Sequence, residues 1–137
     1  MRSEKTVSVL DAFAVLAWAL EEPGGPFVRE LAQQASDGAA RVAICLINLG
    51  EVYYRLHRER GRPFATEKLT EIHEAGIEVV PVTDDLVWSA AQIKAENRVS
   101  YADAFAIATA LELGAPLVTN DPEIVQSGLV RVEWQED

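Results

Sequence analysis

Short apolar runs alternate along the chain with longer segments in which apolar residues recur at helical spacing. The runs that predict buried strands are TVSVL (6–10), RVAICL (41–46), EVVPV (78–82), PLVT (116–119) and LVRVEW (129–134). The segments predicted as helices are residues 12–20, 27–36, 48–60, 65–75, 85–96 and 101–113, with a short helix beginning at Pro122. Strands that alternate with helices predict an α/β fold with a central, mainly parallel sheet of four to five strands flanked by helices.

Length and composition fit a single domain over residues 1–137, without a linker or internal repeat. A chain of 137 residues can bury a core without disulfides or a structural metal. The single cysteine, Cys45, lies inside an apolar run, and Asp11 interrupts the apolar run near the N-terminus where a secretion signal would have no charge. No apolar run is long enough to cross a membrane. We therefore expect a cytoplasmic protein.

Acidic side chains recur at or near the predicted helix starts. They are Asp11, Glu51, Asp103 and Asp121. Asp11 and Asp121 directly follow strands, as N-cap residues do. The pairs Ser100–Asp103 and Asn48–Glu51 have the spacing of a capping box. Helix capping alone is therefore an adequate explanation of each acid taken singly.

Their joint arrangement favours a second role. Residues just past the carboxyl ends of parallel strands line one edge of the sheet, where α/β proteins bind ligands. Asp11 and Asp121 belong at that edge and Glu51 lies close to it, whereas Asp103 follows a helix and its position stays open. Converging carboxylates repel one another unless a cation neutralises them. With only two histidines and one cysteine in the chain, such an all-oxygen group suits Mg²⁺ or Mn²⁺ better than zinc.

Three segments, in this order, resemble the PIN-domain ribonuclease family, especially its VapC-like toxins of type II toxin–antitoxin pairs. They are SVLDAFAVLAWAL, INLGEVYYRL and SYADAFAIATALELGAPLVTNDPEI, and together they extend over essentially the whole chain. The resemblance implies a single PIN-like domain. It also implies that Asp11, Glu51, Asp103 and Asp121 bind one or two Mg²⁺ or Mn²⁺ ions and hydrolyse RNA phosphodiester bonds with a metal-activated water.

The resemblance extends to further residues and to partners. Thr119 corresponds to the small hydroxyl residue that orients a ligand or a metal-bound water in the family, while Asn120 and Glu123 lie at variable positions and have at most a peripheral role. The implied partners are an RNA substrate, such as tRNA or another structured RNA, and a cognate antitoxin protein. A homodimer is also expected, and no membrane.

The net charge of −10 and the pI near 4.6 oppose generic nucleic-acid binding. One local exception is the segment YRLHRERGR, which contains Arg55, Arg58, Arg60 and Arg62. These arginines fit a solvated helix end, whose cations favour the helix dipole. They fit equally well a patch that binds RNA phosphates or an acidic partner segment. The sequence leaves both interpretations open.

Two other α/β protein classes fit the sequence less well. Haloacid-dehalogenase-type phosphatases also place an acid after the first strand, but they require a second aspartate where this chain has Phe13. Response-regulator receivers require a lysine after a late strand, which is missing. The alternatives that stay open are a catalytically silent PIN-like module that binds RNA or protein, and a stand-alone RNA-processing nuclease.

Overall fold

The computed structural model describes residues 5–136, so residues 1–4 and 137 of the predicted domain lie outside the described part. The strands are β1 (Val7–Leu10), β2 (Arg41–Cys45), β3 (Glu78–Val80), β4 (Leu117–Val118) and β5 (Val132–Glu133). The helices are α1 (Ala12–Ala19), α2 (Gly25–Ser36), α3 (Leu46–Arg60), α4 (Arg62–Glu74), α5 (Asp84–Glu96), α6 (Tyr101–Leu113) and α7 (Pro122–Ser127). No helix in the described part combines the length and apolarity needed to cross a bilayer.

The strands form one sheet in the order β3-β2-β1-β4-β5, and each neighbouring pair is parallel. The predicted α/β fold with a parallel sheet of up to five strands is confirmed. From β1 the chain adds β2 and β3 on one side and later β4 and β5 on the other side. The strand order therefore reverses between β1 and β4, and the crevice at the carboxyl ends of two such strands is where open α/β sheets bind ligands.

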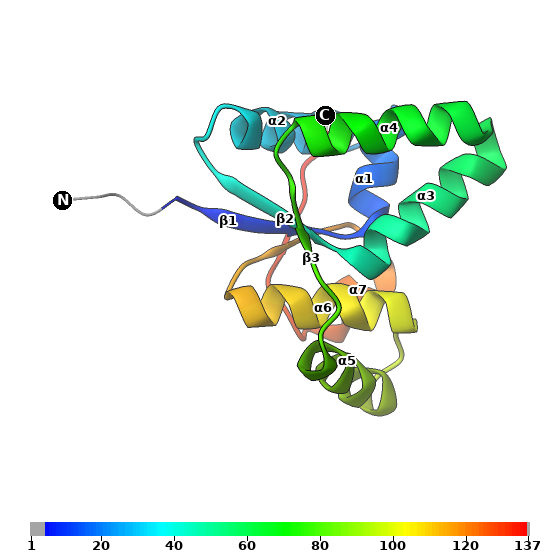
Figure 1. Cartoon of the computed structure of the whole chain (residues 1–137). Helices are drawn as coiled ribbons and strands as arrows, with labels where there is room; N and C mark the ends of the chain where they lie inside the picture. Colours follow the sequence, from blue (N-terminus) through cyan, green and yellow to red (C-terminus); the bar gives the residue numbers. More distant parts are fainter. Residues whose placement is uncertain (1–4, 137) are drawn as a thin grey trace.

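Helices cover both faces of the sheet. Helices α1 to α4 pack on one face, and α5 to α7 pack on the other (Figure 1). Successive strand residues point to opposite faces, so Leu10 and Val118 join the first core while Val9 and Leu117 join the second. Burial on both faces explains why β2 is a continuous apolar run after Arg41 instead of an alternating one.

Helix α3 begins earlier than predicted. Its first residue is Leu46, directly after β2, instead of Asn48, and Cys45 occupies the N-cap position without a side-chain hydrogen bond. The apolar run of β2 continues through Leu46 and Ile47, which are 49% and 37% exposed, so hydrophobicity does not mark the boundary. Asn48 therefore lies inside the helix, and the predicted capping box formed by Asn48 and Glu51 is wrong.

Candidate metal centre

The two strands that flank the switch point each lead into a capping aspartate. Asp11 follows β1, and its Oδ1 accepts a hydrogen bond from the backbone N–H of Ala14 at 2.8 Å. Asp121 follows β4, and its Oδ1 accepts a hydrogen bond from the backbone N–H of Glu123 at 2.9 Å. Both predicted N-caps are confirmed. Each cap engages one carboxylate oxygen and leaves the other oxygen outside the cap.

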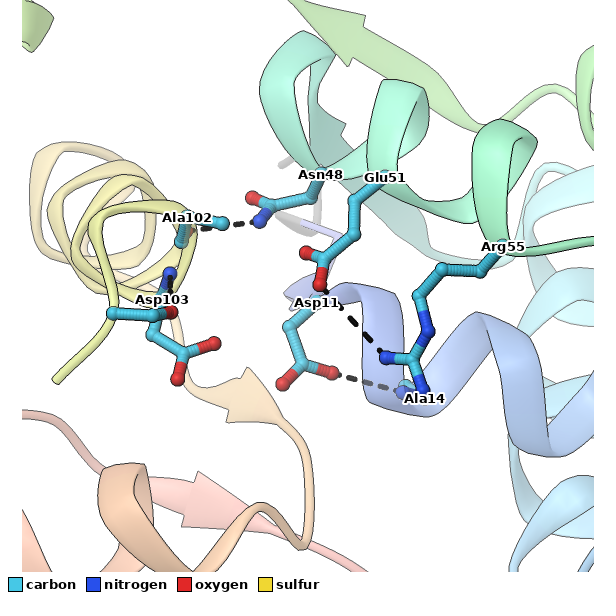
Figure 2. A network of polar contacts seen from close by, with 8 residues as sticks. Asp11, Ala14, Asn48, Glu51, Arg55, Ala102 and Asp103 are labelled. Carbon is cyan, nitrogen blue, oxygen red and sulfur yellow. Dashed lines mark hydrogen bonds and ion pairs between the residues drawn. The ribbon is translucent and has the colours of Figure 1, made fainter. Parts of the chain in front are cut away.

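Glu51 and Asp103 reach the same edge from two helices. Asp103 lies in the first turn of α6, where its backbone N–H donates to Ser100 Oγ at 3.0 Å, as predicted. Glu51 lies in the second turn of α3. Helix α6 packs against both β1 and α3. As a result, the carboxylates of Asp11, Glu51 and Asp103 point into one space between α1, α3 and α6 (Figure 2).

One further acid joins the group. Carboxylate oxygens of Asp103, Asp121 and Glu123 all lie within 4.8 Å of one another. Glu123, to which the sequence interpretation gave at most a peripheral role, is therefore part of the acidic group in space. Its place in the first turn of α7, two residues after the capping Asp121, is the signal that could have marked it. We use "acidic cluster" below for Asp11, Glu51, Asp103, Asp121 and Glu123.

Asp11 is the most deeply buried member of the acidic cluster, with 1% of its surface exposed. Its Oδ2 is buried and has no hydrogen-bond partner among the described residues. Burial raises the pKa of Asp11 to about 7, the hydroxyl of Thr119 and the Ala14 N–H oppose this rise, and the charges of Asp103 and Asp121 add to it. An ionised carboxylate at this position is costly unless donors or a cation offset its burial.

The other acids are coupled in the same way. Burial raises the pKa of Asp103 to about 6, with contributions from the charges of Asp121, Glu51 and Glu123. Burial also raises the pKa of Glu51, the charge of Arg55 lowers it, and the charge of Asp121 raises it. Each of these carboxylates therefore feels at least one other, which is expected of a single electrostatic site and not of independent helix caps.

The donor set fits a hard divalent cation. Every side chain of the acidic cluster offers oxygen, and neither histidine nor cysteine belongs to the group found among residues 5–136. Oxygen-only sites suit Mg²⁺ and Mn²⁺, whereas zinc sites use histidine and cysteine. A bound cation would also supply the missing partner of Asp11 Oδ2 and offset the repulsion between the carboxylates.

Thr119 joins the two capping aspartates. Its side chain is fully buried, and its Oγ1 accepts a hydrogen bond from the backbone N–H of Asp121 at 3.0 Å. The same hydroxyl lowers the pKa of Asp11, so it favours the ionised carboxylate. Thr119 thus holds the loop after β4 against Asp11, whatever further ligand it meets.

The four arginines of the predicted patch have different surroundings in the structure. Arg55 Nη1 lies 3.8 Å from Glu51 Oε2, one helical turn away (Figure 2). The guanidinium of Arg58 lies over the ring of Tyr54, and that of Arg60 lies over the ring of Phe64. Arg62 is the first residue of α4. In the described part of the chain, Arg55 is the patch arginine that forms an ion pair with the acidic cluster.

A family model described as the PIN domain matches residues 8–128, which include the whole acidic cluster. The chain belongs to the PIN domain family. The resemblance seen in the sequence is thereby confirmed. Comparison of this PIN domain with curated proteins gave no match.

Several solved structures share the fold of this PIN domain at low sequence identity. VapBC2 from Rickettsia felis, bound to a DNA fragment from its promoter, is 19% identical with a TM-score of 0.72 and covers 95% of this chain and 100% of its own. Mycobacterium tuberculosis VapC20, a Sarcin-Ricin loop cleaving toxin, is 20% identical with a TM-score of 0.71 and coverages of 92% and 98%. DNA-bound VapBC from Salmonella typhimurium is 21% identical with a TM-score of 0.73 and coverages of 93% and 97%.

Proposed function

We propose that this PIN domain is a divalent-metal-dependent endoribonuclease that hydrolyses RNA phosphodiester bonds. The observation that supports the proposal is the convergence of acids from α1, α3, α6 and α7 at the switch point of the sheet. Capping explains why an acid stands at a helix start, but it does not require these helix starts to share one site. The unpartnered Asp11 Oδ2 adds to this support, because a buried carboxylate oxygen without a donor is costly.

The chemistry follows from the donor set. A bound Mg²⁺ or Mn²⁺ supplies a water of lowered pKa and neutralises charge on the phosphate in the transition state. Asp11, Glu51, Asp103 and Asp121 would bind the cation, and Glu123 lies close enough to Asp103 and Asp121 to offer a further oxygen. Thr119 holds Asp11 and Asp121 in register. Arg55, at the margin of the acidic cluster, is the residue we assign to a phosphate of the RNA.

We also propose that the protein is the toxin of a toxin–antitoxin pair and acts in the cytoplasm. The similar folds include VapBC complexes and a toxin, which supports this assignment. A surface groove between α1, α2 and α4 is lined by Trp18, Arg29 and Glu71 among others, and this mixed lining suits an amphipathic antitoxin segment.

On the other face of the sheet, Trp88 on α5 (73% exposed) and Leu111 on α6 (53% exposed) suit a homodimer contact. A small reading frame next to the gene would favour the toxin over a stand-alone nuclease.

The second candidate function is a catalytically silent PIN-like module that binds RNA or protein. Such a module has no need of a complete acidic cluster. All four predicted acids are present, and burial together with mutual repulsion raises the pKa of Asp11 and of Asp103. This unfavourable arrangement is difficult to explain in a protein that binds no cation, so we favour the enzyme.

Cleavage of total RNA tests the proposal. The purified protein is expected to cut RNA in Mg²⁺ or Mn²⁺ and to lose this activity in EDTA. Asp103→Asn is expected to lower the rate at least about 100-fold, because a direct ligand should matter at least as much as outer-shell partners, whose loss costs 10–100-fold. The fragments are resolved by gel electrophoresis and sequencing. Cleavage that persists in EDTA, or full activity of Asp103→Asn, would rule out the proposed site.

Arg55→Gln is expected to weaken RNA binding more than it slows the chemical step. Losing one phosphate contact should raise KM roughly 10-fold. It should also reduce the slope of the logarithm of the binding constant against the logarithm of the salt concentration by about one. Arg60→Gln is the matched control, since it removes the same charge from a residue that lies over Phe64. Kinetics between 50 and 200 mM salt measure both effects. Equal changes in KM for the two variants would show that Arg55 has no special contact.

A further inference from the structure

Asn48 is a buried polar residue that helix capping does not explain. It lies in the first turn of α3, three residues before Glu51, so both side chains lie on the same side of the helix. Only 1% of its surface is exposed. Residues in such an environment are usually apolar, and a buried amide is retained at a cost unless its hydrogen bonds are made.

The Asn48 amide bridges two helices. Its Nδ2 donates a hydrogen bond to the backbone carbonyl of Ala102 at 3.0 Å (Figure 2). A carbonyl oxygen only accepts, so this contact fixes which end of the amide faces Ala102. Ala102 lies in the first turn of α6 and directly precedes Asp103. The bond therefore connects the turn before Glu51 with the residue before Asp103.

The other end of the amide remains unpartnered. Asn48 Oδ1 is buried and has no hydrogen-bond partner among the described residues. Among residues 5–136, Asp11 Oδ2 is the other buried side-chain atom in this condition, and it belongs to the acidic cluster. Two incompletely satisfied polar groups thus lie at the same edge of the sheet, on elements that carry the acids. A position selected only for stability would favour an apolar residue here.

We propose that Asn48 is a positioning residue of the metal centre. Its amide ties the first turn of α3 to the first turn of α6 and so sets the separation of Glu51 from Asp103. Without this tie, two helices that carry mutually repelling carboxylates have one less contact to hold them at a spacing that a cation can bridge. The inference rests on the proposed function, since it concerns the cation that the acidic cluster would bind.

Titration of Mn²⁺ into the metal-free protein by calorimetry tests the role directly. Asn48→Ala is expected to weaken Mn²⁺ binding about 10–100-fold, the range measured when outer-shell partners of metal ligands are removed. Thr109→Val is the matched control, because Thr109 is also fully buried and its Oγ1 donates to Phe105 O at 2.7 Å within α6. This control loses a buried hydrogen bond within α6, the helix that Asn48 contacts through Ala102, and should keep the Mn²⁺ affinity of the wild type. Urea unfolding in EDTA shows how much stability each variant loses.

A double variant separates positioning from general destabilisation. In an Asp103→Asn background, Asn48→Ala should weaken Mn²⁺ binding much less than it does in the wild type, because the carboxylate that it positions is gone. If Asn48→Ala does not fold, Asn48→Ser, which is too short to reach Ala102, takes its place with the same expectation.

The outcomes distinguish this inference from the proposed function. Wild-type Mn²⁺ affinity in the Asn48 variant, or an equal loss in Thr109→Val, overturns the role of Asn48 and leaves the nuclease intact. A wild-type protein that binds no Mn²⁺ overturns both.

Discussion

Asp11→Asn is expected to abolish RNA cleavage and, in the same protein, to stabilise the metal-free fold. The variant removes the buried carboxylate whose Oδ2 lacks a partner, so we expect activity to fall at least about 100-fold. The stability effect has the opposite sign. Burial and the neighbouring acids raise the pKa of Asp11 from 3.8 to about 7, which corresponds to about 4 kcal/mol of destabilisation at pH 8 without a cation.

Asparagine removes this charge and keeps the helix cap. Its side-chain oxygen can still accept from Ala14, and its amide N–H₂ places no negative charge beside Asp103 and Asp121. Because the amide must also be desolvated, we expect a net gain of about 1–3 kcal/mol in the free energy of unfolding. Urea unfolding in EDTA at pH 8 measures it. Asp85→Asn is the control, since it removes an exposed charge from the first turn of α5. A metal-free Asp11→Asn that is less stable than the wild type would contradict the proposed origin of the strain.

The positions of two acids could be predicted from the sequence, because helix caps and strand ends determine them. Asp11 and Asp121 each lie between a buried strand and a helix, and parallel strands bring their carboxyl ends to one edge. A cap and a strand end are local features, so both residues could be placed from their neighbours. Ser100 as the cap of α6 follows from the same local logic.

Tertiary packing decided what the sequence left open. Asp103 reaches the acidic cluster only because α6 packs across β1 and against α3. Asn48 was misread because the apolar run of β2 enters α3 without a change in hydrophobicity, so the helix start was displaced by two residues. Glu123 has an ordinary first-turn position, and only the close approach of α7 to Asp103 gives it a role. None of these contacts leaves a periodic signal.

The metal-free protein is expected to lose stability as the pH rises from about 4 to about 8. Asp11, Asp103 and Glu51 all have a pKa raised in the folded state, so in this range the folded chain binds more protons than the unfolded chain. The free energy of unfolding then falls with increasing pH until the folded groups have titrated, near pH 6 for Asp103 and pH 7 for Asp11. Asp11 alone accounts for a decrease of up to about 4 kcal/mol.

A divalent cation should reverse this trend. Ionised carboxylates bind the cation and protonated ones do not, so Mn²⁺ should stabilise the fold little at pH 5 and strongly at pH 8. At a concentration 100 times its Kd, a ligand that binds only the folded state adds about 2.7 kcal/mol to the free energy of unfolding.

Urea unfolding at each pH, in EDTA and in Mn²⁺, measures the free energy of unfolding against pH with and without the cation. In Asp11→Asn the metal-free curve should be much flatter and the effect of Mn²⁺ at pH 8 much smaller. A wild-type stability in EDTA that is constant or increases between pH 5 and pH 8 would refute the coupling, because the buried carboxylates would then be compensated without a cation.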